Sequence, residues 1–171
     1  MKACIATAFA VLISLSGLAS AATETQGPFD RLKALAGEWE GTVTTTPPEP
    51  SVQGKSAHVS LRVTSMGHAL MHEMRIHGRP DDPITMFYLD GDRLLLTHYC
   101  DAGNRPRMEG KMVPDGKKVE FNLLDVAGTT EYGHMHNAAF AVIDPDHHTE
   151  EWTFMLDKGP VRARFDLQRK K

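Results

Sequence analysis

The chain has 171 residues, 41% of them hydrophobic, and a formal net charge of −3. This length is sufficient for one domain with a real core. The small negative charge provides no basic surface of the kind that binds nucleic acid or a membrane surface, so we expect no nucleic-acid partner.

Residues 1–21 have the pattern of a secretory signal peptide. A short positive start precedes the almost wholly apolar stretch 3–19, and residues 19–21 (ASA) fit the small-x-small cleavage rule. Cleavage there would leave a mature domain of residues 22–171, periplasmic or secreted, with no membrane span. A retained transmembrane helix is the alternative, because the apolar stretch approaches the ~17–25 residues that span a bilayer.

Residues 29–42 join a short helix to a first strand. Four apolar residues within 29–36 have the spacing of one helix face, and Gly37 is expected to end the helix. Trp39 then opens the segment WEGTVTTT, whose composition is typical of a strand. We expect this stretch to form the start and the closed end of an antiparallel barrel.

The remaining chain alternates strand-like segments with tight turns. After a Pro-rich loop at 46–54, strict alternation of apolar and polar residues begins, and turns such as Asp90-Gly91 separate the segments. The expected strands after the first are 55–64, 68–77, 84–89, 93–100, 105–113, 118–124, 134–143, 147–156 and 161–170. Short hairpin connections predict an all-β fold, a single up-and-down antiparallel β-barrel of about ten strands.

The triplet Gly37-Glu38-Trp39 resembles the G-x-W signature of the calycins, which include lipocalins and fatty-acid-binding proteins. In those families an arginine at the end of the last strand packs across the tryptophan, and Arg169 lies in the matching place. A guanidinium over an indole forms a cation–π contact of about 0.5–2 kcal/mol, so Trp39 and Arg169 are expected to close the barrel. The helix with this triplet and the stretch 86–108 most resemble small exported bacterial calycin-like domains of unknown function. That resemblance covers nearly all of the mature chain and implies a fold but little chemistry.

A more remote likeness is to the nitrobindin family, haem-binding barrels that begin with the same helix and G-x-W triplet. Nitrobindin-like proteins ligate haem through a histidine near the C-terminus. This sequence has no histidine after His148, so that ligand cannot be transferred to it.

The histidines are the unusual group of polar residues, since there are nine of them. His98 and Cys100 lie two residues apart on one expected strand, and His134 and His136 do the same on another, so each pair points to one face. Imidazole and thiolate suit zinc, copper or haem iron, and these four residues could therefore hold haem or a transition metal inside the barrel. The simpler interpretation is that His98 and His134 are hydrogen-bonded interior residues.

An enzyme that uses His98 with a cavity carboxylate is a further alternative. No nucleophile motif, zinc-protease helix or phosphate-binding loop supports it, so a non-enzymatic role is favoured. Glu150 is expected at the rim of the barrel, and His147 and His148, which follow a turn, are expected in solvent.

We therefore expect a small-molecule-binding barrel that holds a mostly apolar ligand in its cavity. The expected ligand-binding residues are Trp39, Leu70, His72, Met86, Leu96, His98, Cys100, Phe121, His134, His136, Phe140, Phe154 and Phe165.

Overall fold

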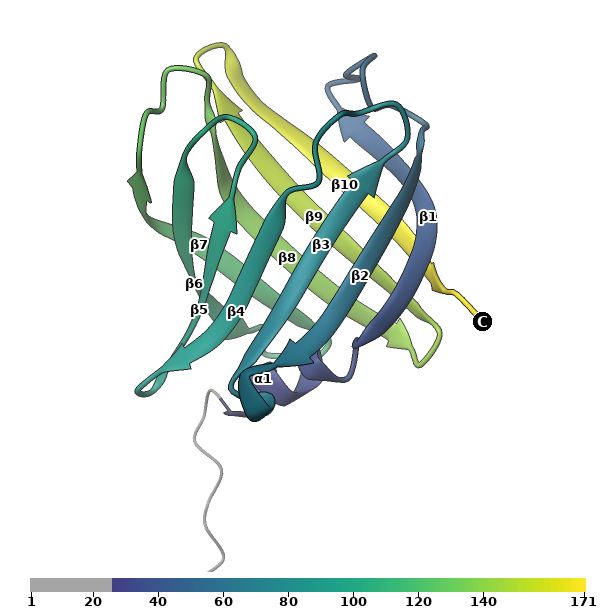
Figure 1. The fold of residues 1–171 in the computed structure, drawn as a ribbon, viewed down its shortest axis with the longest axis vertical. Coiled ribbons are helices and arrows are strands. Elements are labelled where there is room, and N and C mark those ends of the chain that lie inside the picture. The colour runs from purple at the N-terminus through teal and green to yellow at the C-terminus, as the bar shows by residue number, and fades with distance from the viewer. Residues whose placement is uncertain (1–25) are drawn as a thin grey trace, which may run out of the picture.

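The computed structural model describes residues 26–171, which form a closed antiparallel β-barrel of ten strands (Figure 1). The helical segments are α1 (Gln26–Lys33) and the 3-10 turn η1 (Ser65–Gly67). The strands are β1 (Gly37–Thr46), β2 (Ser56–Thr64), β3 (Ala69–Ile76), β4 (Ile84–Asp90), β5 (Arg93–Tyr99), β6 (Arg105–Met112), β7 (Lys118–Ala127), β8 (His134–Asp144), β9 (His147–Leu156) and β10 (Gly159–Arg169). The predicted all-β, up-and-down barrel is thus confirmed, whereas the predicted signal peptide lies outside the described residues.

Each strand pairs with its neighbours in sequence, and β1 pairs with β10 to close the barrel. The closing register places Trp39 opposite Arg169 and Val43 opposite Phe165. Closure leaves no free sheet edge, which removes the usual site for edge-to-edge association. Among the described residues, no helix is long and apolar enough to cross a membrane.

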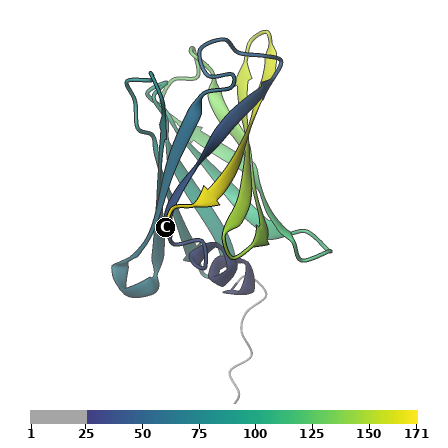
Figure 2. The ribbon, with the colours of Figure 1, turned by 90° about the vertical axis from the view of Figure 1, so that its right-hand side faces the viewer.

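Helix α1 lies across one end of the barrel, as Figures 1 and 2 both show. The helix ends at Lys33, and the amides of Leu35 and Ala36 then bond to carbonyls three residues back. Gly37, expected to end the helix, instead begins β1 with a φ of 139°. A tight turn therefore separates helix and strand, because the chain must bend sharply to enter the barrel wall.

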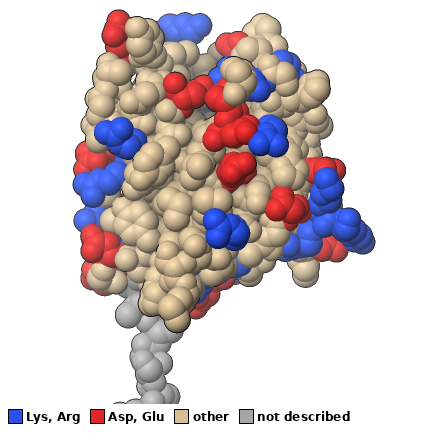
Figure 3. Space-filling view, viewed as in Figure 1, with Lys and Arg blue, Asp and Glu red and all other residues tan. Residues whose placement is uncertain are grey.

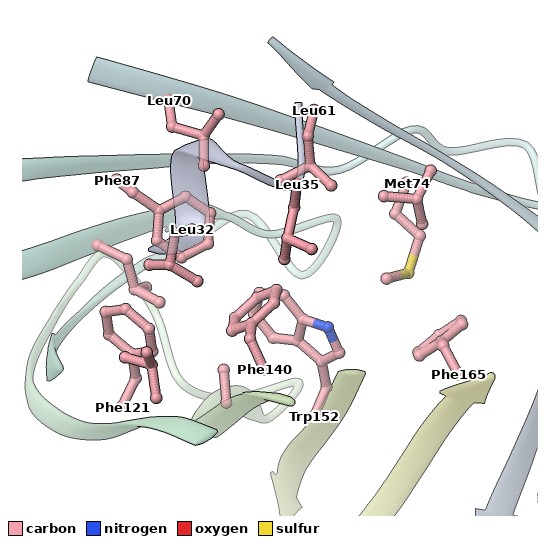
Figure 4. Packing of buried hydrophobic residues seen from close by; sticks show 14 of the residues in the cluster. Leu32, Leu35, Leu61, Leu70, Met74, Phe87, Phe121, Phe140, Trp152 and Phe165 are labelled. Atoms are coloured by element: carbon pink, nitrogen blue, oxygen red, sulfur yellow. The ribbon is translucent and has the colours of Figure 1, made fainter. Parts of the chain in front are cut away.

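The closed end of the barrel is densely packed. Leu32 of α1 and Leu35 of the turn after it reach the aromatic rings of Phe87, Phe121 and Phe140 (Figure 4), and all five side chains are at most 2% exposed. The three rings are packed edge to face, with centroids 5.3–6.0 Å apart, a favourable geometry for aromatic pairs.

Trp39 and Arg169 lie together at this closed end. The indole is fully buried, and its Nε1 donates a hydrogen bond of 2.8 Å to the Leu35 carbonyl. The Arg169 Cζ lies 4.1 Å from the centre of the indole ring. The same guanidinium donates to the carbonyls of Ala36 and Pro145, at 2.9 and 3.0 Å. One side chain thereby connects the start of β1, the end of β10 and the β8–β9 turn.

Candidate functional site

A cavity of about 640 Å³ opens at the end of the barrel opposite α1. Residues from the β1–β2, β3–β4, β5–β6 and β7–β8 connections surround its mouth. The wall is mostly apolar and includes Met74, Ile76, Met135, Phe154, Ala163 and Phe165. This volume lies within the range of about 300–1,000 Å³ that is typical of small-molecule sites.

His72 of β3, His98 of β5 and Trp152 of β9 form the floor of this cavity. The Trp152 ring centroid lies 5.7 Å from that of His72 and 5.4 Å from that of His98. On its other side, His72 packs edge to face against Phe140 of the closed-end core, with centroids 6.1 Å apart. The three rings therefore separate the packed half of the barrel from the hollow half.

Glu150 is fully buried at this floor and accepts hydrogen bonds from three ring nitrogens. The donors are Nε2 of His72 at 3.0 Å, Nε2 of His148 at 3.1 Å and Nε1 of Trp152 at 3.0 Å. Because β3 and β9 are not neighbours in the barrel, the bond from His72 to Glu150 crosses the interior. We call His72, His148, Glu150 and Trp152 the Glu150 cluster.

The Glu150 cluster holds an ionised carboxylate away from solvent. Burial alone would raise the pKa of Glu150, but the His72 charge and the hydrogen bonds from His148 and His72 outweigh burial and hold this pKa well below its ordinary value of 4.5. The Nδ1 atoms of His72 and His148 are buried and find no hydrogen-bond partner among the described residues. Each ring thus directs its bonded nitrogen, Nε2, at the carboxylate.

His98 is the second histidine of the floor and is only 5% exposed. Its Nδ1 lies 2.8 Å from the hydroxyl oxygen of Thr85, a hydrogen bond that leaves Nε2 for a ligand. Burial, together with the charge of His72, lowers the pKa of His98 to about 4. The ring is therefore a neutral imidazole near pH 7, able to donate or accept a hydrogen bond according to its tautomer.

Cys100 also lines the cavity, close to its mouth. Its Sγ donates to a carboxylate oxygen of Asp101 at 3.5 Å. Burial raises the pKa of the Cys100 thiol to about 11, so the side chain remains protonated at neutral pH. A thiol in this state is a poor nucleophile and a poor metal ligand.

Acidic side chains gather at the mouth of the cavity, where Glu49, Asp81 and Asp101 are among the lining residues. Arg79 bonds to Asp81 at 3.0 Å and to Asp101 at 2.5 Å. On the face shown in Figure 3, Asp and Glu side chains lie close together in the upper half, toward the open end. Entering molecules therefore pass a mouth at which carboxylates outnumber cations.

The predicted ligand-binding residues fall into three places. His72, His98, Cys100, Phe154 and Phe165 line the cavity. Trp39, Leu70, Leu96, Phe121 and Phe140 are buried in the packed core. Met86, His134 and His136 lie at outward positions of β4 and β8. The cavity is thus confined to the open end, and the apolar residues expected to line it near α1 fill space instead.

Strand parity explains the outward residues. Thr85 and Phe87 are buried inside the barrel, so Met86 between them points outward. Met135 lines the cavity, so His134 and His136 on either side of it lie on the outer face, with ring nitrogens 3.3 Å apart.

The four predicted metal ligands consequently do not converge. His98 and Cys100 lie inside the barrel, whereas His134 and His136 lie outside it. Within residues 26–171, no three His, Cys, Asp or Glu side chains are grouped so as to hold a metal ion.

Two expectations about β9 are wrong. His148, expected in solvent, and Glu150, expected at the rim, are both 0% exposed. The turn before β9 is at the closed end, where the His148 ring packs 4.2 Å from that of Trp39 and is shielded from water. His147 points outward, with Nε2 3.0 Å from Asp166. The sequence does carry a signal for the cluster, because His148, Glu150 and Trp152 alternate along one strand and must share a face.

Comparison with protein-family models finds no match, and neither does comparison with curated proteins. Solved structures share the fold, two of them over most of this chain. A protein of unknown function from the DUF3598 family of Nostoc punctiforme PCC 73102 aligns with a TM-score of 0.57 and 16% identity, over 81% of this chain and 48% of that chain. Rv2717c from M. tuberculosis aligns with a TM-score of 0.58 and 14% identity, over 84% of this chain and 97% of that chain. The chain thus spans about half the length of the first, and at these identities the likeness shows a barrel fold alone.

Proposed function

We propose that this protein binds a small, mostly apolar molecule in the cavity at the open end of the barrel. The observation that supports this most directly is the cavity itself: about 640 Å³ of space with an apolar wall and a floor of His72, His98 and Trp152. An apolar pocket with a few convergent polar groups is the usual form of a small-molecule site. Burial of the ligand against the wall would supply the affinity, at about 25 cal/mol per Å² of apolar surface removed from water.

The test is a titration of the protein with Prodan, an uncharged naphthalene dye whose emission shifts in apolar surroundings. We expect saturable binding that the variant Ala163→Phe weakens, because Ala163 lines the cavity. The matched control is Ala139→Phe, since Ala139 lies between the inward residues Ala138 and Phe140 and therefore points outward. Equal affinity in both variants would place the dye outside the cavity and refute the proposal.

A haem-binding barrel is the second candidate, and the position of His98 favours it. The neutral imidazole of His98 faces the cavity and would be the residue that holds haem iron, which would supply redox or gas-binding chemistry there. Haemin titration should then produce a Soret band that His98→Ala shifts or abolishes and that His134→Ala, on the outer face, leaves unchanged. Haemin whose spectrum stays that of the free compound would exclude this candidate.

We also propose that the protein is exported, with a calycin-like barrel as its mature domain. The pattern of residues 1–21 supports export, and the Gly37-Glu38-Trp39 triplet with Arg169 over the indole supports the calycin resemblance. N-terminal sequencing of protein isolated from the periplasm or the medium should start near Ala22. Recovery of the chain only in the cytoplasm with Met1 in place would contradict export.

A further inference from the structure

We propose that the cavity selects an uncharged amphiphile, an apolar body ending in a hydroxyl group, and that it rejects anionic amphiphiles of the same length. This inference rests on the proposed ligand-binding function and adds the chemical class of the ligand's polar end. Three features of the described residues support it: the free nitrogen at the floor, the saturated carboxylate beside it, and the charges at the mouth.

The floor offers a hydrogen-bonding position but no unpaired positive charge. His98 engages Thr85 through Nδ1, which leaves Nε2 for a ligand at the bottom of the cavity. Next to it, the Nδ1 of His72 is buried without a partner among the described residues. A hydroxyl group can both donate and accept, so it satisfies an imidazole nitrogen in either tautomer. An alkyl end would leave that nitrogen unpaired, at a cost of about 1–3 kcal/mol.

A carboxylate end fits this floor poorly. Glu150 already places one buried negative charge in the cluster, where it is paired with His72, and its three donors, His72, His148 and Trp152, direct their N–H groups at it rather than at the cavity. His98 is only 5% exposed and neutral, so it provides no cation for a second anion. Burying an unpaired carboxylate is far costlier than burying a hydroxyl with a hydrogen-bond partner.

The mouth of the cavity is also negatively charged, as the carboxylate at the floor is. Of the described residues that line the cavity, Glu49, Asp81 and Asp101 are acidic, and Arg79 is the one arginine or lysine. Arg79 is already paired with Asp81 and Asp101, so it is not free to receive an anionic head group. Lys158, which does not line the cavity, attracts the Glu49 carboxylate electrostatically. An anionic amphiphile therefore meets repulsion at the mouth and lacks a counter-ion at the floor.

Competition between Prodan and three ten-carbon amphiphiles tests this inference: decanol, decanoate and decylamine at pH 7. We expect decanol to displace the dye at a concentration at least about tenfold lower than decanoate, a difference of about 1.4 kcal/mol. If decanoate displaced the dye at the same concentration as decanol or at a lower one, the inference would be overturned while the proposed function stayed intact. If decylamine displaced the dye at a clearly lower concentration than decanol, the choice of an uncharged head group would be overturned. Failure of Prodan and all three amphiphiles to bind would refute the proposed function itself.

Two variants test the assigned residues. His98→Phe should weaken decanol by about fivefold through loss of one neutral hydrogen bond, and His134→Phe on the outer face should leave decanol binding unchanged. The double change Asp81→Asn and Asp101→Asn frees Arg79 and should strengthen decanoate by about tenfold. Its control is Asp125→Asn, which removes a carboxylate paired with Arg107 on the outer wall. Far-ultraviolet circular dichroism should be used to check that each variant is folded. If the double variant does not fold, Asp101→Asn alone replaces it. Unchanged selectivity in folded variants would refute these roles.

Discussion

Replacement of Glu150 by glutamine should cost about 2–4 kcal/mol of the free energy of unfolding. Glutamine has nearly the same shape as glutamate but only one acceptor oxygen. Trp152 can only donate, so the amide oxygen of glutamine must take the place of Oε2, which Trp152 contacts at 3.0 Å. The amide NH₂ then takes the place of Oε1, directly facing His148 Nε2, which lies 3.1 Å away in the native protein.

The magnitude follows from what that exchange removes. His148 must move its proton to Nδ1 in order to accept from the amide, and the hydrogen bonds of His148 and His72 lose their ionised acceptor. Hydrogen bonds to a charged group contribute about 1.5–3 kcal/mol, against about 0.5–1.5 kcal/mol for neutral pairs. Two weakened bonds in a fully buried site account for the expected loss.

The pH dependence of this loss gives a second, independent readout. The pKa of Glu150 in the folded protein lies well below its ordinary value of 4.5, so the unfolded chain takes up a proton first as the pH falls. The stabilisation from the carboxylate is therefore complete above about pH 5 and is lost as the pH falls from there toward the folded-state pKa. The stability gap between the native protein and Glu150→Gln should be constant near neutral pH and should narrow below about pH 4.5.

Urea unfolding followed by circular dichroism measures both quantities, with an unchanged slope as the condition for comparing midpoints. The control is Glu151→Gln, the next residue of β9, whose exposed carboxylate pairs with Arg164 at 2.5 Å. Such a surface pair contributes about 0–1 kcal/mol. If Glu150→Gln were no more destabilised than Glu151→Gln, or if the gap did not narrow in acid, the assignment of a buried, ionised carboxylate would be refuted.

Three further changes probe the barrel. Trp39→Ala should cost about 3–5 kcal/mol, because the indole is fully buried at the closed end, and a loss below about 1 kcal/mol in a denaturant melt would contradict its role in closure. His98, whose pKa falls from 6.5 to about 4 on folding, should make the native protein less stable as the pH drops through that interval, and His98→Phe should show a flatter profile there. Gly41→Ala should lower stability by at least about 2 kcal/mol, because an added Cβ would lie 1.8 Å from the carbonyl oxygen of Asp166, whereas at Gly27 nothing lies within 4 Å and the same change should be nearly silent in thermal unfolding.

The barrel itself could be predicted from the sequence because its signals are local. Strict alternation in 55–64 and 161–170 places the inward faces, and turns such as Asp90-Gly91 mark where the chain reverses. The structure has a strand in both ranges, β2 and β10, and β10 ends with Arg169 opposite Trp39. Local periodicity also placed Glu150 and Trp152 on one face.

Depth along the barrel axis was not predictable in the same way. Alternation tells which side chains point inward, but it does not tell how far from the closed end each lies. Phe121 and Phe140 point inward as expected and pack under α1, whereas Phe154 and Phe165 point inward and line the wall of the cavity. Their position depends on the tilt and register of strands that are far apart in sequence.

Contacts across the interior are likewise invisible to local patterns. His72 and Glu150 are 78 residues apart and lie on strands that never pair. Only closure of the whole barrel brings the imidazole within 3.0 Å of the carboxylate, and at β8 irregular register at Met135 further obscures which residues face inward.

The Glu150 cluster also explains how one barrel can have a packed core at its closed end and a cavity at its open end. An apolar side chain at Glu150 would extend the packed core, but it would leave the N–H groups of His72, His148 and Trp152 without an acceptor. With the carboxylate present, His72 is held across the barrel in one orientation and meets Trp152 to form a rigid floor. A rigid floor keeps the space above it from collapsing, because side chains from the wall cannot sink past it. Preorganised cavities bind at lower entropic cost, so a buried ionised group that holds the floor in one orientation contributes to ligand binding as well as to folding.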